Sequence, residues 1–317
     1  RAGRRKRSVH VLWFGDSHTY ADFWPDAVRD RLQKRYGNGG PGYVLVGMKP
    51  YRHAGLDFGL TGEWRHEPAG PSTALRTGDG QFGLLGIRTL PDSGDATASV
   101  ELQPGAVRDK AHWQILFRAL AGDRMSVRLG TTVSASLDAH AGIAGPAGSP
   151  IRRLALDSGP TARLEASASA GAPQLFGAII ESTSLGVVVD TLGINGARAA
   201  TPLAWDDAAW VAEIGARAPD LVVLAYGTNE IAETRPVEQY AGHYRKLLER
   251  VRRAAPQVDC FMAGPTDWDE ADGTTKPRVV EIDPVERAVA AELGCEYFSV
   301  YDAMGGDGSH TRWEHEK

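Results

Sequence analysis

The feature that most constrains the fold is a short apolar run near the start of the chain that ends in a polar turn. Residues 11–14, Val-Leu-Trp-Phe, are continuously apolar, which is typical of a buried strand in a parallel sheet. Gly15, Asp16 and Ser17 then interrupt the run. Open α/β sheets bind their ligands beyond the carboxyl ends of the strands, so Ser17 would lie where a nucleophile is useful. A helix-capping turn alone would also explain these three residues.

The composition is that of a globular protein and argues against several other classes. Of the 317 residues, 42% are hydrophobic and 24% are charged. No run of 18 apolar residues predicts a membrane span, and the formal charge of −5 argues against a general nucleic-acid binder. The first seven residues are strongly basic, and we interpret them as a solvated linker or as a contact to an anionic surface. The sequence does not begin with Met and shows no apolar signal segment, so we expect a mature or trimmed form of the protein.

The pattern of the chain changes near residue 60 and again near residue 185. Between these points short alternating apolar runs are separated by clusters of Gly, Pro and Asp. This pattern predicts antiparallel strands packed as a β-sandwich. The expected strands cover residues 97–102, 112–120, 125–129, 131–137, 153–156, 163–168 and 175–181.

On both sides of this region, buried strands alternate with helices. In the first helix, Val28, Leu32 and Tyr36 share one face, which we expect to be buried. The predicted fold class is therefore α/β, a parallel sheet flanked by helices with an inserted all-β sandwich. The predicted domains are a discontinuous one, residues 1–58 and 186–317, and the insert, residues 59–185. The expected strands here are 11–14, 185–190, 221–226, 258–263 and 296–301, and the expected helices are 25–36, 206–217, 237–254 and 284–293.

Cysteine and aromatic side chains give weaker signals. Cys260 and Cys295 are too few for a disulfide scaffold or a Cys-rich metal site. Each lies beside an expected strand, so buried free thiols are the default expectation and pairing stays open. Trp64, Trp113 and Phe176 could stack on a carbohydrate, although packing in the core is the interpretation that we favour for each.

Three short motifs each follow an expected buried strand, and the carboxyl ends of parallel strands meet at one edge of a sheet. This arrangement suits acyl transfer, in which Ser17 would attack a carbonyl carbon. The backbone N–H groups of Ser17 and Gly196 and the side-chain amide of Asn229 could then bind the oxyanion. Taken singly, Gly196 and Asn229 are ordinary turn residues. The motifs are residues 15–18 (Gly-Asp-Ser-His), 192–197 (Leu-Gly-Ile-Asn-Gly-Ala) and 227–230 (Gly-Thr-Asn-Glu).

These motifs resemble the blocks of the SGNH (GDSL-type) hydrolase superfamily, which implies a serine esterase that uses Ser17, Gly196 and Asn229. The first motif and residues 35–40, Arg-Tyr-Gly-Asn-Gly-Gly, are similar to those of bacterial peptidoglycan O-acetylesterases. That branch carries a carbohydrate-binding-module-like β-sandwich between its first two blocks.

The resemblance implies removal of O-acetyl groups from peptidoglycan or a related bacterial polysaccharide, and an extracytoplasmic location. The implied partner is an acetylated polysaccharide. The alternatives are a xylan acetylesterase, a lipase- or thioesterase-like enzyme, or a catalytically inactive carbohydrate-binding protein of the same fold. The oligomeric state stays open.

The catalytic base is the least determined part of the expected site. SGNH enzymes take it from a C-terminal Asp-x-x-His, and Asp307 and His310 have this spacing after the last expected strand. The resemblance also aligns residues 304–313 with a Gly-rich segment that precedes the pair in this branch, which would place the pair beyond Lys317. For His18 we expect a structural role or a substrate contact. No metal-ligand spacing is recognisable, so we expect no metal and no cofactor.

Overall fold

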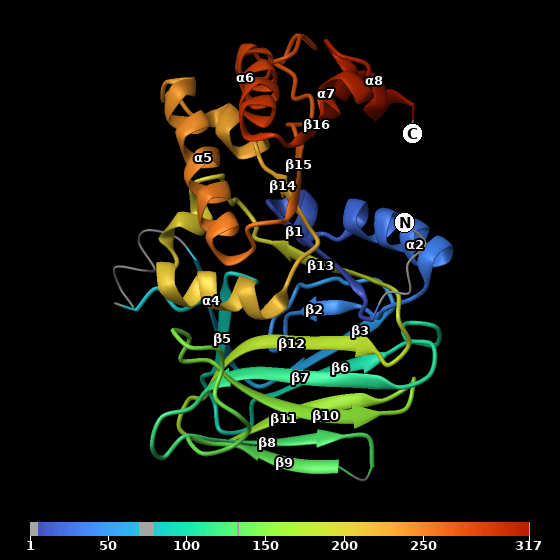
Figure 1. Ribbon diagram of the computed structural model, residues 1–317, viewed down its shortest axis with the longest axis vertical. Coiled ribbons are helices and arrows are strands. Elements are labelled where there is room, and N and C mark those ends of the chain that lie inside the picture. Colours follow the sequence, from blue (N-terminus) through green and yellow to red (C-terminus); the bar gives the residue numbers. More distant parts are fainter. Residues whose placement is uncertain (1–5, 70–78, 132, 317) are drawn as a thin grey trace.

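The computed structural model describes residues 6–69, 79–131 and 133–316, and Figure 1 shows how they are arranged. Most of the basic N-terminal run, residues 1–5, lies outside the described residues. The described strands form one five-stranded parallel sheet and two antiparallel sheets of six and five strands. No helix in the described parts of the chain is both long and apolar enough to cross a membrane.

The first expected strand lies inside the parallel sheet, whose order is β13-β1-β14-β15-β16. Strand β1 pairs with β13 on one side and β14 on the other, and Gly15 lies opposite Gly193 and Ala225. The loops that follow these three strands therefore emerge at one edge of the sheet, as the sequence predicts. The strands are β1 (Val9–Gly15), β13 (Val187–Gly193), β14 (Leu221–Ala225), β15 (Asp259–Ala263) and β16 (Glu296–Phe298).

Helices cover the faces of the parallel sheet (Figure 1). The longest has the predicted limits, whereas the helix expected to begin at Pro284 begins at Pro277 and continues through Pro284. Val279 and Ile282, which precede this internal proline, are fully buried, so packing holds this part of the helix. The helices are α1 (Ser17–Tyr20), α2 (Phe23–Tyr36), η1 (Thr201–Ala204), α4 (Asp207–Arg217), η2 (Thr228–Ala232), α5 (Val237–Ala254), α6 (Pro277–Leu293), α7 (Val300–Met304) and α8 (Ser309–His315).

Helix α2 does not bury the face that the sequence predicts. Val28 and Tyr36 are exposed and Leu32 is half-buried, whereas Arg29 is only 4% exposed. The Arg29 guanidinium lies 2.7 Å from the buried carboxylate of Asp22 and donates to a threonine hydroxyl on β13 at 3.2 Å. A charge pair therefore organises the buried face, and apolar periodicity does not reveal such a pair.

The chain between α2 and β13 forms the two antiparallel sheets, which lie below the parallel sheet in Figure 1. Their orders are β10-β7-β12-β5-β4, with β2 paired to β12, and β3-β6-β11-β8-β9. Every strand expected in this region is present: β6 (Thr97–Leu102), β7 (Ala111–Arg118), β8 (Arg124–Leu129), β9 (Val133–Leu137), β10 (Arg152–Ser158), β11 (Arg163–Ala170) and β12 (Gln174–Ser182). The strands that the sequence did not predict are β2 (Gly42–Val44), β3 (Leu56–Thr61), β4 (Trp64–Pro68) and β5 (Ile87–Pro91). These are short, and their Gly, Pro and charged residues obscure the alternation.

The sheet that contains β7 is buried on both faces. Trp113, Ile115 and Phe117 pack into the core shared with the other antiparallel sheet. Leu116 points the other way and joins the core formed with the parallel sheet. Because side chains alternate along a strand, β7 connects the two cores.

Buried polar contacts join the same layers. The Asp190 carboxylate on β13 accepts from the Arg217 guanidinium of α4 at 2.9 Å and from the Tyr43 backbone N–H of β2 at 2.8 Å. Arg217 also donates to Glu181 of β12. The parallel sheet and the adjacent antiparallel sheet are thus held together by charged groups as well as by apolar packing.

The aromatic side chains considered for sugar stacking belong to the core. Trp113 and Phe176 are fully buried, and the Trp113 indole donates to Ser158 Oγ at 2.9 Å. Trp64 is half-buried and packs against the core between the antiparallel sheets. The packing interpretation is confirmed for all three, and stacking on a ligand would require Trp113 and Phe176 to leave the core.

The expectation of free thiols is wrong, because Cys260 and Cys295 form a disulfide with a Cα–Cα separation of 4.8 Å. Strand β15 pairs with β16, and Phe261 lies opposite Glu296. Each cysteine precedes one of these paired residues, so the sheet register brings the two together. Register between strands is a tertiary property that cysteine spacing alone does not reveal.

Candidate active site

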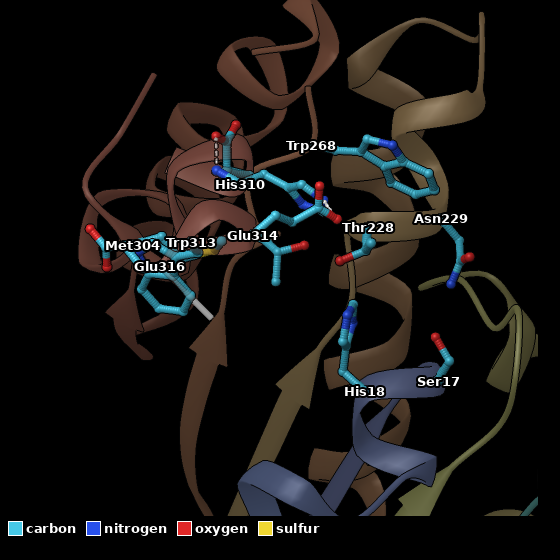
Figure 2. Close-up of a pocket in the computed structure, with 12 residues that line it drawn as sticks. Ser17, His18, Thr228, Asn229, Trp268, Met304, His310, Trp313, Glu314 and Glu316 are labelled. Atoms are coloured by element: carbon cyan, nitrogen blue, oxygen red, sulfur yellow. Dashed lines mark hydrogen bonds and ion pairs between the residues drawn. The ribbon is translucent and has the colours of Figure 1, made fainter. Parts of the chain in front are cut away.

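The loops at the carboxyl edge of the parallel sheet and the C-terminal helices enclose a cleft of about 720 Å³ (Figure 2). Ser17 and Asn229 line it from the loops after β1 and β14. Trp268 lines it from the loop after β15, and His310 and Glu314 line it from α8. The structure therefore brings the expected nucleophile, one expected oxyanion donor and one expected base into a common cleft.

Ser17 is the first residue of α1 and is half-buried. Asp16 caps this helix, and its carboxylate accepts from the His18 backbone N–H at 2.9 Å. The backbone N–H of Ser17 has no acceptor among the described residues, as is usual in the first turn of a helix. A Cβ on Gly193 would lie 2.1 Å from the Tyr20 nitrogen, so only glycine lets β13 approach α1 this closely.

His18 forms a pair with Asp16 at the edge of the cleft. Its Nδ1 lies 3.3 Å from Asp16 Oδ1, and its ring stacks on Trp24 with the ring centroids 6.3 Å apart. The hydrogen bond to Asp16 raises the pKa of His18. This pairing agrees with a structural role for His18 and also leaves the ring on the cleft surface.

The backbone conformation of Gly196 explains why this residue is glycine. Its φ is +74°, a left-handed conformation, and a Cβ there would meet no atom within 4 Å. The backbone conformation therefore requires glycine, not a shortage of space. Gly196 is exposed, and its N–H has no acceptor among the described residues.

Asn229 connects the second and third motifs. Its side-chain Nδ2 donates to the Ala197 carbonyl at 2.9 Å. The backbone carbonyl of Asn229 accepts from Arg198 Nε at 3.3 Å. One N–H of the Asn229 amide is thus engaged in holding the neighbouring loop. The other remains available for a ligand in the cleft.

Glu230 is a buried residue that the sequence analysis did not assign a role, although it ends the third motif. Its Oε1 accepts from the Ala199 N–H at 2.7 Å and its Oε2 accepts from the Gly227 N–H at 3.2 Å. Burial raises the pKa of Glu230 to about 7. The bond to Ala199 ties the loop after β13 to the loop after β14, which carries Glu230 itself, whereas the bond to Gly227 closes the first turn within the loop after β14.

Asp307 and His310 are not joined in a hydrogen-bonded pair within the described residues. The Asp307 carboxylate accepts from the Thr275 N–H at 3.0 Å. His310 Nε2 lies 3.3 Å from Glu314 Oε1, and Figure 2 shows the ring across the cleft from Ser17. No hydrogen bond between His310 and Ser17 occurs in the described part of the chain.

Asp267 anchors the opposite wall of the cleft and was also missed by sequence reasoning. This buried carboxylate accepts from Thr275 Oγ1 at 2.7 Å, from Ser309 Oγ at 3.0 Å and from the His310 N–H at 3.0 Å. Burial opposes its ionisation, but these hydrogen bonds prevail and lower the pKa of Asp267. It therefore holds the first turn of α8 against the loop after β15.

The sequence profile described as the GDSL-like Lipase/Acylhydrolase family matches residues 157–315. This range includes the second and third motifs and does not reach Ser17. No curated protein sequence matches the chain.

Solved structures show where this fold recurs. One, described as "Peptidoglycan O-acetylesterase in action, 5 min", has a TM-score of 0.77 and 24% identity over 98% of this chain and 83% of that chain. A family two carbohydrate esterase from Clostridium thermocellum has a TM-score of 0.30 and 11% identity over 66% of this chain and 84% of that chain, too low to carry an argument. The chain belongs to the GDSL-like lipase/acylhydrolase family of carboxylic ester hydrolases and has the fold of a peptidoglycan O-acetylesterase.

Proposed function

We propose that this esterase removes O-acetyl groups from peptidoglycan or a related bacterial polysaccharide through an acetyl-enzyme on Ser17. The observation that carries the proposal is the common cleft in which Ser17 and Asn229 lie at the ends of adjacent parallel strands. The likeness to a structure described as a peptidoglycan O-acetylesterase supports the acetyl ester and the glycan.

In the proposed reaction Ser17 Oγ attacks the acetyl carbonyl carbon, and a base takes the hydroxyl proton. The oxyanion is bound by the N–H groups of Ser17 and Gly196 and by the available N–H of the Asn229 amide. The ester C–O bond then breaks, and the protonated base returns its proton to the departing sugar oxygen. Water attacks the acetyl-enzyme in the same way, which releases acetate and restores Ser17.

The side chains of His310 and Asp307 are held by partners other than Ser17 and each other. For His310 to serve as the base, its ring must leave Glu314 and turn across the cleft, and Asp307 must leave the Thr275 N–H. These contacts support the alternative expected from the resemblance, in which the Asp-x-x-His pair follows Lys317. Asp307 and His310 then act as residues of the cleft wall.

The domain organisation and the compartment of the protein follow the same family resemblance. We propose that residues 59–185 form an inserted β-sandwich, similar to a carbohydrate-binding module, between the two parts of the hydrolase domain, residues 1–58 and 186–317. The disulfide between Cys260 and Cys295 supports an oxidising, extracytoplasmic compartment.

Replacement of Ser17 by Ala tests the nucleophile. We expect at least a thousandfold loss of p-nitrophenyl acetate cleavage and of acetate release from O-acetylated peptidoglycan. Ser134→Ala is the matched control, because Ser134 is exposed on β9 of the outer sheet. Full activity of the Ser17 variant would contradict the proposal. Faster cleavage of long acyl esters would favour a lipase-like enzyme, and faster release from acetylxylan would favour a xylan acetylesterase.

A further inference from the structure

The indole of Trp268 differs from the core indoles in being open to the cleft. Trp268 is 42% exposed, whereas Trp113 is fully buried. It lines the cleft that also contains Ser17 and Asn229, and in the view of Figure 2 its ring lies above Asn229. A large aromatic ring kept in water beside a reactive hydroxyl is a characteristic of ligand contacts.

The ring is held in place by its surroundings. The Lys276 ammonium lies 4.7 Å from the ring centroid, and the Lys276 N–H donates to the Trp268 carbonyl at 2.8 Å. The preceding residue is the buried Asp267, which is tied to Thr275 and Ser309. Because one ring face is backed by Lys276 and the loop is anchored, little conformational freedom would be lost on binding.

The charges of the cleft limit which sugars fit it. Asp267, Glu314 and Glu316 contribute carboxylates to its lining. Among residues 6–69, 79–131 and 133–316, no Lys or Arg side chain lines it. Even with the Lys276 ammonium behind Trp268, the three carboxylates leave an excess of negative charge, which disfavours a polyanionic glycan. An uncharged sugar ring can place its apolar C–H face on the indole.

We propose that Trp268 is the stacking platform of a subsite for an uncharged hexosamine ring of the glycan. This inference rests on the proposed function, because the platform shares its cleft with Ser17. It adds a binding residue that holds the polysaccharide while the acetyl group reaches the nucleophile. No covalent step takes place at this subsite.

The test measures binding without turnover. Ser17→Ala protein is titrated with chitotetraose, an uncharged N-acetylglucosamine tetramer, by calorimetry and by tryptophan fluorescence. We expect the additional substitution Trp268→Ala to raise the dissociation constant at least tenfold and to remove most of the fluorescence change. Trp268→Phe should retain most of the affinity, since it keeps an aromatic face. Leu120→Ala, at an exposed apolar residue of the loop between β7 and β8, should bind as the parent does.

Two results would overturn the proposal. One is an unchanged dissociation constant in a folded Trp268→Ala variant, with folding checked by circular dichroism. The other is binding of oligogalacturonate as tight as that of chitotetraose. Acetate release from O-acetylated peptidoglycan by the wild type is measured in parallel. Binding at Trp268 without acetate release would refute the proposed function alone, and acetate release without a Trp268 effect would refute the platform alone.

Discussion

The two walls of the cleft are built in different ways. On the wall formed by the strand ends, the Asn229 amide holds the Ala197 carbonyl, and buried Glu230 accepts one backbone N–H from the loop after β13 and one from its own loop. On the opposite wall, Asp267 anchors the first turn of α8 through hydrogen bonds. Later in the same helix, the side chain of Trp313 is 50% exposed. The wall formed by the strand ends, which we call the first wall, is thus fixed by internal hydrogen bonds, the arrangement that the proposed oxyanion binding requires.

The opposite wall, which we call the second wall, can change its side-chain contacts more readily. The contact between His310 and Glu314 is exposed to solvent, and such exposed side-chain contacts contribute little to stability. This contrast predicts that substitutions on the first wall impair chemistry, whereas substitutions on the second wall impair anchoring or have small effects.

Asn229→Ala should have the largest effect. It removes the proposed oxyanion donor and the contact to Ala197 together, so we expect kcat to fall about 10²–10³-fold with a smaller change in KM. Steady-state cleavage of p-nitrophenyl acetate measures this. Asn38→Ala is the control, because Asn38 lies beside the start of β13, the end of that strand away from the cleft, and donates to the Gly105 carbonyl. A change confined to KM would show that Asn229 binds substrate without stabilising the transition state.

Asp267→Ala should mainly affect anchoring. The loss of the buried acceptor leaves Ser309 Oγ, Thr275 Oγ1 and the His310 N–H without their partner, so the free energy of unfolding should fall by about 2–3 kcal/mol. Urea denaturation measures this. Asp272→Ala, an exposed residue of the same loop, should change stability by less than about 0.5 kcal/mol. Equal effects of the two substitutions would mean that Asp267 does not anchor α8.

Glu230→Gln should alter how stability depends on pH. Burial raises the pKa of Glu230 from 4.5 to about 7, so between these values the folded state keeps a proton that the unfolded state releases. Linkage then makes the free energy of unfolding fall as the pH rises through this window. Gln does not ionise, so the variant should lack this fall. The free energy of unfolding of the variant minus that of the wild type should therefore rise by about 1 kcal/mol or more between pH 4.5 and 7.5.

Urea denaturation at several pH values tests this expectation for Glu230. The exposed Glu249→Gln variant is the control and should follow the wild-type curve in parallel. Parallel curves for Glu230→Gln as well would show that the buried carboxyl ionises at the same pH in the folded and unfolded chains.

His310→Ala should have the smallest effect on activity, less than about tenfold, and Glu314→Ala should match it. The reason is that His310 contacts Glu314 and makes no hydrogen bond to Ser17 within the described residues. Cleavage of p-nitrophenyl acetate by the full-length protein measures both. A thousandfold loss in the His310 variant alone would identify His310 as the base and would show that the second wall takes part in the chemistry.

Local sequence patterns were enough for the elements that carry the first wall. The apolar run before Gly15 and the run before Gly227 predicted β1 and β14 because fully buried parallel strands are continuously apolar. Parallel pairing then brought Ser17 and Asn229 to one edge, so two of the expected site residues followed from strand order alone. The family profile confirmed the superfamily that these motifs indicated.

Tertiary contacts decided the rest. Arg29 is buried by its pairing with Asp22, Cys260 meets Cys295 through the register of β15 and β16, and Asp267 anchors a helix more than forty residues away. None of these contacts repeats with the period of a helix or a strand, so no local pattern marks them. The sequence by itself determined the strands β1 and β14 and the motifs at their ends. The exposure of Trp268, the loop contacts of Glu230 and the orientation of His310 exist only once distant segments pack together, because burial and hydrogen bonding there depend on residues far apart in the chain.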